Sequence, residues 1–434
     1  MGGGIVMTRD EAKTRIHRVM PPVVSEDWPN VPVDRAEGPW LESGDRRIAD
    51  MMAGFAVVNA GHNHPGVIAA AREQMDRVVH APAGVMVAEP QLALAEALAR
   101  ILPGDLDTVW FGNSGAEAID AALKLARYST GRFRFVSFYG SFHGRTLGAT
   151  AVTGSRAGHR RGYGPLLPGV SFVPYPNCFR CPWGRRARDC SLECLDAVSE
   201  HFARVVPPEE VAAIIIEPVQ GEGGFIPVPT KFLDGLRRMC DEHGILLIFD
   251  EIQTGFGRTG RMFAADTLGV KPDLICLAKA MASGFPISAL AGPRSIMGGW
   301  AVGAHGTTFG GNAISAAAGL ATLEVLEAEE LPARAAALGA RVLEKVGSWP
   351  ERFARVGDVR GLGLMIGIEY VEPETGAPDG EAARIVLEGA LERGFLFVPA
   401  GAEGQVVRLT PPLNVPEDLL WEAVDVLEDL TSGI

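Results

Sequence analysis

The sequence of 434 residues is poor in lysine, with six lysines against 34 arginines. It also has only six cysteines, too few for a disulfide scaffold, which indicates a reducing cytoplasm. No apolar run approaches the length of a membrane helix, and the N-terminal stretch MGGGIVMTRDEAKTR lacks the apolar core of a secretory signal. The net charge of −13 disfavours nucleic-acid binding, which needs basic patches. We therefore expect a cytoplasmic protein without nucleic-acid or membrane partners.

Short apolar runs alternate with helical patterns through the middle of the chain. Buried runs of this length between helices are typical of a parallel sheet covered on both faces. The predicted strands are 108–111, 133–138, 212–216, 245–249, 274–277 and 287–291. Predicted helices between them include 116–128 and 231–242. Such α/β sheets bind ligands at the carboxyl ends of their strands, so we expect the chemistry directly after each strand.

The character of the sequence changes near residue 319. A helical pattern over 320–346, interrupted at Pro332, is followed by a strand-like run over 363–370 and a closing helix over 417–430. These patterns predict a smaller α+β domain over residues 319–434, beside a large domain over residues 64–318. Residues 1–63, rich in proline, glycine and short strands, are expected to pack with the smaller domain. A chain of this length usually exceeds one compact core.

Small residues and an aromatic ring follow the first two predicted strands. Ser114, Gly115 and Ala116 open a helix, where free backbone N–H groups can bind a phosphate. A plain helix cap by Ser114 is the alternative. Phe142 could cover a flat cofactor ring, and Arg145 could bind a carboxylate with two parallel hydrogen bonds. A core phenylalanine and a solvated arginine remain the alternative for that pair.

Acids follow the next two strands. Glu217 and Glu222 must be paired or face a cleft, and salt bridges or helix caps would explain them equally well. Asp250 ends an apolar strand and needs a cation, a metal or a protonated ring nitrogen, unless it caps a helix. A later glycine-rich loop, 305–312, contains Thr308, whose hydroxyl could donate to a phosphate.

Among the six lysines, only Lys279 ends a predicted buried strand among small and apolar residues. Burial lowers the pKa of a lysine and favours the neutral amine, which a Schiff-base nucleophile requires. A reactive lysine, a phosphate cup, an aromatic ring, a carboxylate and an arginine are the parts that pyridoxal phosphate needs. The sequence therefore predicts a site for this cofactor.

The motifs together resemble the class III (ω-amino-acid) aminotransferase family. The resemblance is carried by IIIEPVQGEGG, ILLIFDEIQTGFGRTG, LAKAMASGFP and HGTTFGGN, and related motifs run from Gly61 to Leu413, nearly the whole chain. It implies the type I fold of pyridoxal-phosphate enzymes, an α/β fold with a mainly parallel seven-stranded sheet in the large domain. It also implies pyridoxal 5′-phosphate as cofactor and a homodimer with shared active sites, and it leaves open whether two such dimers form a tetramer.

The resemblance also assigns roles to individual residues. Lys279 matches the Schiff-base lysine, which also acts as acid and base, and Asp250 matches the partner of the ring nitrogen. The other cofactor residues that it implies are Ser114, Gly115, Ala116, Phe142, Glu217, Ile252, Gln253 and, from the neighbouring subunit, Thr308. The substrate residues that it implies are Phe55, Arg145, Glu222 and Arg408.

The substrate residues imply a dual-substrate aminotransferase. Arg145 matches an arginine for the carboxylate of ω-amino substrates, while Glu222 and Arg408 match a switch pair that opens for 2-oxoglutarate. This implies amino transfer from an ω-amino or amino acid of the 4-aminobutyrate or ornithine type to 2-oxoglutarate. An amino-acid racemase or epimerase of the same fold family is the alternative, because no motif excludes it. Phe55 replaces a residue that is often smaller, which leaves the preferred chain length of the donor open.

An insert over residues 176–195 resembles one found in a prokaryotic subgroup that includes aminotransferases and racemases. It contains Cys178, Cys181, Cys190 and Cys194. Four cysteines spaced by two, eight and three residues could bind zinc, but the middle gap is short. We expect disulfides or plain packing rather than zinc, and we assign no metal.

Overall fold

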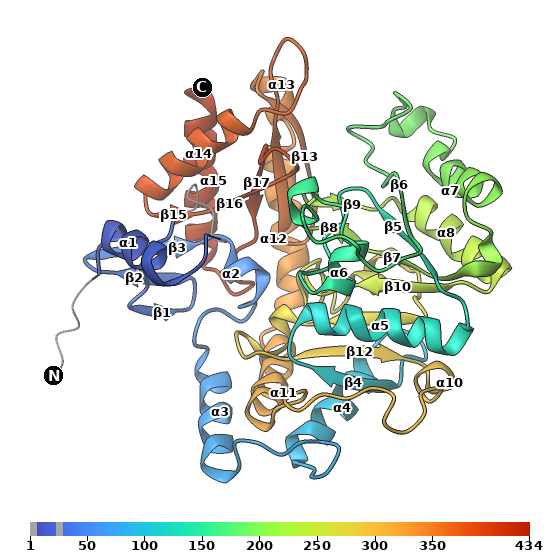
Figure 1. The fold of residues 1–434 in the computed structure, drawn as a ribbon. Helices are drawn as coiled ribbons and strands as arrows, with labels where there is room; N and C mark the ends of the chain where they lie inside the picture. The colour runs from blue at the N-terminus through green and yellow to red at the C-terminus, as the bar shows by residue number, and fades with distance from the viewer. Residues whose placement is uncertain (1–6, 23–28) are drawn as a thin grey trace.

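The computed structural model describes residues 7–22 and 29–434 of the protein. The first six residues, where the expectation about a secretory signal begins, lie outside this range. The chain forms a large α/β part and a smaller α+β part, with the N-terminal residues beside the latter (Figure 1). No helix within the described ranges is long and apolar enough to cross a membrane.

A seven-stranded sheet forms the centre of the large part. In spatial order its strands are β4 (Thr108–Gly112), β12 (Ser288–Gly292), β11 (Leu274–Leu277), β10 (Leu246–Asp250), β7 (Val211–Ile216), β5 (Arg134–Phe138) and β6 (Val170–Val173). Only the pairs made by β12 are antiparallel, which confirms the mainly parallel sheet. The six predicted strands are present to within one residue at each end. The sequence missed β6, a short edge strand that is mostly half-buried and therefore weakly apolar.

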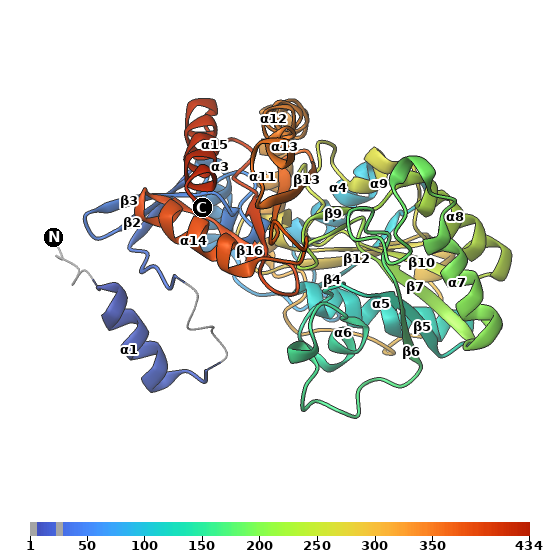
Figure 2. The ribbon, with the colours of Figure 1, turned by 90° about the horizontal axis from the view of Figure 1, so that it is seen from above.

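Helices cover both faces of this sheet, as the top view shows (Figure 2). Ala213 and Ile215 of β7 pack into one core layer, while Ile214 and Ile216 pack into the other. The first layer contains α5 (Gly115–Thr130), α6 (Leu147–Val152) and α10 (Arg294–Met297). The second contains α4 (Glu89–Ile101), α7 (Glu193–Arg204), α8 (Thr230–His243), α9 (Ala264–Leu268) and α11 (Ala313–Ala328). Two buried faces explain why these strands are continuous apolar runs.

The smaller part contains an antiparallel sheet of four strands. In spatial order they are β13 (Val356–Leu362), β14 (Met365–Tyr370), β17 (Val406–Leu409) and β16 (Val398–Ala400). Its helices are α12 (Leu331–Val346), α13 (Trp349–Arg352), α14 (Gly380–Glu392) and α15 (Glu417–Ser432). The helical pattern predicted over 320–346 is two helices, because Pro332 lies in the first turn of α12, where a missing N–H costs nothing. Helix α11 crosses the predicted boundary at residues 318 and 319.

A second four-stranded sheet ties the N-terminal segment to the smaller part. Its strands are β1 (Arg35–Glu37), β2 (Trp40–Ser43), β3 (Arg46–Asp50) and β15 (Phe395–Leu396). The last two are parallel, with Phe395 opposite Ala49. The helices of this region are α1 (Arg9–Val19), α2 (Ala53–Ala56) and α3 (Pro65–Arg77), and a short hairpin of β8 (Val219–Gln220) and β9 (Ile226–Pro227) lies in the large part.

The cysteine insert forms an irregular segment before α7. Its four cysteines line a cavity of about 20 Å³, and all of them are free thiols. Among the residues that the structure describes, no group of three or more histidines, cysteines or acids is arranged to hold a metal ion. Cys194 packs in the buried core, and no disulfide joins it to the other three.

Candidate active site

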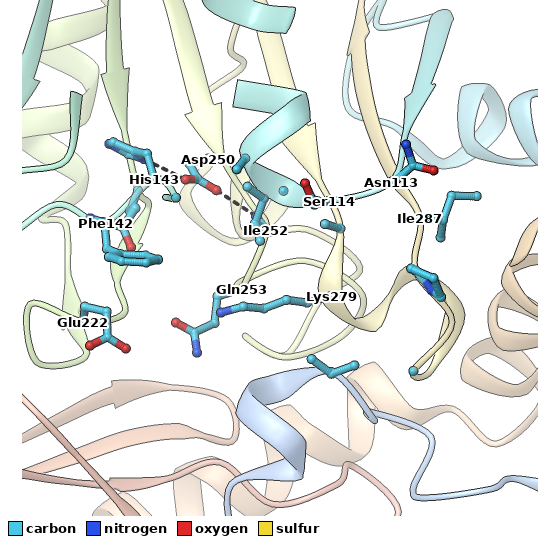
Figure 3. Close-up of a pocket in the computed structure, with 18 of the residues that line it drawn as sticks. Asn113, Ser114, Phe142, His143, Glu222, Asp250, Ile252, Gln253, Lys279 and Ile287 are labelled. Atoms are coloured by element: carbon cyan, nitrogen blue, oxygen red, sulfur yellow. Dashed lines mark hydrogen bonds and ion pairs between the residues drawn. The ribbon is translucent and has the colours of Figure 1, made fainter. Parts of the chain in front are cut away.

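A cavity of about 310 Å³ opens at the carboxyl ends of the central strands. Nine of the cofactor residues expected from the sequence line it: Ser114, Gly115, Ala116, Phe142, Glu217, Asp250, Ile252, Gln253 and Lys279. Glu222, from the expected substrate set, lines it as well. Figure 3 shows the side chain of Lys279 extending across this cavity toward Gln253 and Glu222. The loops after β4, β5, β7, β10 and β11 therefore meet at one place, as expected for such a sheet.

The start of α5 forms one wall of the cavity. Ser114 caps this helix, since its Oγ accepts a hydrogen bond from the N–H of Glu117 at 3.3 Å. Gly115 and Ala116, which precede the first intrahelical hydrogen bonds, line the cavity directly. A Cβ atom at Gly115 would lie 2.8 Å from Cδ1 of Ile252, so a larger residue there would displace the Ile252 side chain. The positive end of the helix dipole and the N–H groups suit a phosphate at this wall.

A buried acid and histidine form the next wall. Nδ1 of His143 donates to Oδ2 of Asp250 at 2.7 Å, and both side chains are buried. The other oxygen, Oδ1, accepts from the N–H of Ile252 at 3.0 Å. These two contacts hold the carboxylate in one orientation at the carboxyl end of β10. A carboxylate held in this way can pair with the protonated nitrogen of a bound pyridine ring.

The lysine lies at the end of β11, in the turn that follows this strand. Burial lowers the pKa of Lys279 to about 8, against the opposing effect of Glu222, and Arg408 lowers it further. Its backbone has a positive φ of 36°, an uncommon conformation for a residue with a side chain. The low pKa makes a neutral amine available close to physiological pH, as a nucleophile or a proton acceptor requires.

Glu217 connects two loops of the site rather than standing free beside the cofactor space. Its two oxygens accept from the N–H groups of Phe142 at 2.8 Å and Gly221 at 2.9 Å. Burial raises the pKa of this carboxyl to about 7, and the charge of Asp250 contributes to the rise. Glu217 thus fixes the position of the Phe142 ring over the cavity.

An ion pair closes the far side of the cavity. An NH2 group of Arg408 donates to Oε1 of Glu222 at 2.8 Å, and the arginine side chain is only 2% exposed. Nε and the same NH2 group also donate to the carbonyl oxygen of Pro399, at 2.8 and 2.6 Å. Burial alone would raise the pKa of Glu222, but the charge and hydrogen bond of Arg408 bring it below its ordinary value. Glu222 is therefore ionised in this pair.

Four of the residues expected in the site lie outside the lining of the cavity, and one of them is Arg408, whose partner Glu222 does line it. The ring of Phe55 lies 5.8 Å from the guanidinium carbon of Arg408, behind the ion pair. Arg145 is exposed, with its guanidinium carbon 5.3 Å from the ring centre of Phe142. Thr308 is exposed in the loop before α11 and does not reach the cavity of its own chain.

His143 is the site residue that the sequence analysis did not assign. The sequence placed it on the same turn as Phe142, but a lone histidine after a strand has many explanations. What distinguishes this histidine is its contact with Asp250, which is 107 positions away in the sequence. Only the parallel register of the strands brings the two side chains within hydrogen-bond distance. The Nε2 atom of His143 is buried without a hydrogen-bond partner among residues 7–22 and 29–434, which suits a polar group of a ligand.

The donor set fits pyridoxal phosphate. The start of α5 suits its phosphate, Asp250 its ring nitrogen, and Lys279 its aldehyde. Phe142 and Ile252 lie in the lining where they can cover the two faces of a flat ring, and Gln253 offers an amide to the ring hydroxyl. When bound, this cofactor withdraws electrons from the α-carbon of an amino substrate.

The chain is similar to known proteins over nearly its whole length. The class-III aminotransferase profile matches residues 23–431. An alanine/serine racemase from Pyrococcus horikoshii is 39% identical over 407 residues, which cover 92% of this chain and 85% of the racemase. A 5-aminovalerate aminotransferase from Pseudomonas putida is 39% identical over 391 residues, 90% of each chain.

A solved structure agrees over the same length. An amine transaminase from an uncultivated Pseudomonas species, in its form with bound pyridoxal phosphate, superposes with a TM-score of 0.89 at 33% identity. The match covers 96% of this chain and 98% of the transaminase. The chain therefore belongs to the class-III aminotransferase family and is a pyridoxal-phosphate-dependent aminotransferase of fold type I.

Proposed function

We propose that the protein transfers the amino group of an ω-amino or amino acid, of the 4-aminobutyrate or ornithine type, to 2-oxoglutarate. The observation that carries this proposal is the Glu222–Arg408 pair at the edge of the cavity. Such a pair can serve two unlike substrates, because the same arginine is masked or free depending on the position of the acid. The similarity to a 5-aminovalerate aminotransferase supports an ω-amino donor.

Residues of the chain have separate roles in the proposed reaction. The neutral amine of Lys279 would remove the proton from the carbon that bears the donor's amino group and would return it on the side of the bound cofactor. Asp250, held by His143, would keep the ring nitrogen of the cofactor protonated. Phe142 and Ile252 would cover the two faces of the ring and exclude water from them. Arg145 binds the distant carboxylate of the amino donor at the mouth of the site.

The switch follows from the partners of Arg408. While an amino donor occupies the site, Glu222 neutralises the arginine, so the uncharged part of the donor meets no unpaired cation. When 2-oxoglutarate enters, Glu222 moves away and the α-carboxylate takes its place on Arg408. The carbonyl oxygen of Pro399 accepts two hydrogen bonds from Arg408, and these bonds hold the guanidinium while its acidic partner is exchanged.

Racemisation or epimerisation of an amino acid is the second candidate activity. The similarity to an alanine/serine racemase favours it. A racemase needs a proton donor on the face of the α-carbon opposite Lys279. Glu222 faces the lysine across the cavity (Figure 3), but the charge and hydrogen bond of Arg408 hold its pKa below the ordinary value, although burial opposes this. An ionised Glu222 is a poor proton donor, which makes transamination the better supported activity.

We also propose a homodimer in the cytoplasm with active sites shared between its subunits. Exposed apolar side chains lie near Thr308, and the ring of Phe309 lies 5.1 Å from His80, which joins two exposed stretches into one surface. The apolar side chains that a partner subunit would cover there include Val85, Met86, Val87 and Phe309. Free thiols throughout the described chain suit a reducing compartment.

A half-reaction tests the activity. The holoenzyme is mixed with single amino donors, including 4-aminobutyrate, ornithine and neutral L-amino acids, without any keto acid. Stoichiometric conversion to the pyridoxamine form, followed by its return on adding 2-oxoglutarate, is the expected result. An unchanged cofactor spectrum together with decaying optical rotation would instead establish a racemase.

The shared site is tested by complementation between inactive subunits. Lys279→Ala and Thr308→Ala chains are mixed, unfolded and refolded together. If Thr308 serves the neighbouring subunit, each mixed dimer contains one intact site, and activity rises above that of either variant alone. Equal activity before and after mixing would place Thr308 outside the partner's site.

A further inference from the structure

A left-handed turn places Phe55 beside Arg408. The φ angles of Ala53, Gly54, Phe55 and Ala56 are 46°, 57°, 68° and 59°. Three of these four residues have side chains, for which this conformation is unfavourable. In Figure 3 the turn, α2, is the light-blue ribbon below Lys279 and Gln253. A run of this kind persists only where the surrounding structure holds it.

A buried carboxylate holds the turn. Asp50 ends β3 and is 1% exposed. Its Oδ1 accepts from the N–H of Met52 and its Oδ2 from the N–H of Gly54, both at 2.9 Å. Nε2 of His62 donates to the same Oδ2 at 2.8 Å. The carboxylate thus bonds to the entry of the turn with both oxygens, and the histidine fixes its orientation.

Direct contacts connect the left-handed turn with Arg408 and its strand. The Phe55 ring lies 5.8 Å from the guanidinium carbon of Arg408. Just before the turn, the carbonyl oxygen of Met51 accepts from the N–H of Thr410, two residues beyond Arg408, at 2.9 Å. Just after it, Val57 lines the cavity. A shift of the turn therefore alters the surroundings of Arg408 through two contacts, the Phe55 ring and the Met51–Thr410 hydrogen bond.

We infer that Asp50 and His62 are positioning residues that set the geometry of the α-carboxylate site through the left-handed turn. Neither residue lines the cavity, so they act through Phe55 and the backbone contacts near Arg408. The inference rests on the proposed function, in which Arg408 binds the α-carboxylate of the keto acid. A donor such as 4-aminobutyrate has no α-carboxylate and does not need this geometry.

Paired half-reactions of the holoenzyme test the inference. Asp50→Asn leaves one acceptor oxygen for two backbone donors, and His62→Leu removes the donor to Asp50. Both variants should raise the half-saturating concentration of 2-oxoglutarate by about tenfold, because small misplacements of binding groups are costly. The half-saturating concentration of 4-aminobutyrate should stay within about twofold. His62→Gln, which keeps a donor, should restore most of the loss.

Asp379→Asn is the matched control. Asp379 is also a buried carboxylate, 5% exposed, that caps a turn by accepting from Ala382 at 2.9 Å and pairs with a cation, Arg355. It lies at the start of α14, away from the cavity, and its loss should change neither half-reaction. Equal weakening of both half-reactions in Asp50→Asn, or a match between Asp50→Asn and the control, would overturn the inference.

Failure of the proposed function gives a different result. If the wild-type enzyme does not convert 4-aminobutyrate or 2-oxoglutarate, the proposed function is wrong. The same variants are then titrated with L-alanine, followed by the cofactor spectrum. Weaker binding in Asp50→Asn and His62→Leu, but not in Asp379→Asn, supports the positioning role, whereas equal binding ends it. Should Asp50→Asn fail to fold, His62→Leu alone decides, since His62 lies closer to the surface.

Discussion

The cofactor wall and the substrate wall of the cavity are built in different ways. The cofactor wall consists of residues at or just beyond the ends of neighbouring strands, so the ladder of one sheet sets their spacing. Asp250, for example, lies opposite Cys276, three residues before Lys279. The substrate wall consists of Glu222, which lines the cavity, together with Phe55 and Arg408, which lie behind it. These residues come from three separate segments, and the ion pair between Glu222 and Arg408 spans 186 residues of sequence.

Because of this difference, the groups expected to hold the cofactor and the groups expected to select the substrate lie in separate parts of the molecule. A rigid sheet suits the groups that hold the cofactor, because their geometry must not vary. Contacts between the N-terminal segment, the hairpin region and the smaller part can change without disturbing that sheet. Relatives at 39% identity carry the names of a racemase and an aminotransferase, so the fold alone does not set the reaction.

Replacement of Lys279 should cause the largest loss of activity among substitutions in the cofactor wall. Lys279→Ala should lower activity by several orders of magnitude, because the residue is both the attachment point and the base. The purified variant should not retain the cofactor after borohydride treatment. Lys231→Ala, at the exposed start of α8, is the control and should behave like the wild type. Covalent retention of the cofactor by Lys279→Ala would show that another group attaches it.

Removing the charge of Asp250, at the end of its strand, tests the same wall with a smaller expected loss of activity. Asp250→Asn keeps the shape of the side chain but removes the charge, and we expect a loss of about 10²–10³-fold in kcat, as for other fixed electrostatic contacts. The variant should still attach the cofactor through Lys279, as borohydride trapping would show. Steady-state rates close to those of the wild type would remove Asp250 from its assigned role.

The two arginines should separate the two substrates. Arg145→Ala should raise the KM of ω-amino donors, and Arg408→Ala that of 2-oxoglutarate, each by about tenfold or more for a lost charged hydrogen bond. Loss of Arg408 also leaves Glu222 without its partner, so that variant should lose more. Unchanged kinetics of Arg145→Ala with every amino donor would show that its exposed position above Phe142 has no part in binding.

The pH dependence of cofactor attachment should show the smallest effect. Burial lowers the pKa of Lys279 to about 8, so the amine is mostly charged below that pH and neutral above it. The rate at which apoenzyme binds pyridoxal phosphate covalently should rise about tenfold per pH unit below the pKa and level off above it. An ordinary exposed lysine would still show a rising rate at pH 9. Absorbance during reconstitution measures this profile.

The sequence by itself determined the strands, the helices that flank them and ten of the residues that line the cavity. These features are local, since an apolar run predicts a buried strand and the next few residues must lie at its carboxyl end. The same logic found Lys279 among six lysines, because it is the one that follows such a run. It missed the edge strand β6, whose four mostly half-buried residues give a weak apolar pattern.

Only the tertiary structure decided the contacts between distant segments. The bond from His143 to Asp250 depends on the register of parallel strands. The pair of Glu222 with Arg408 was expected only from the family resemblance, because its contact depends on how the smaller part packs against the sheet. The left-handed turn at Phe55 has no sequence signal beyond Gly54, because its stability comes from the Asp50 carboxylate bonded across it. Contacts of this kind depend on positions that no local pattern encodes.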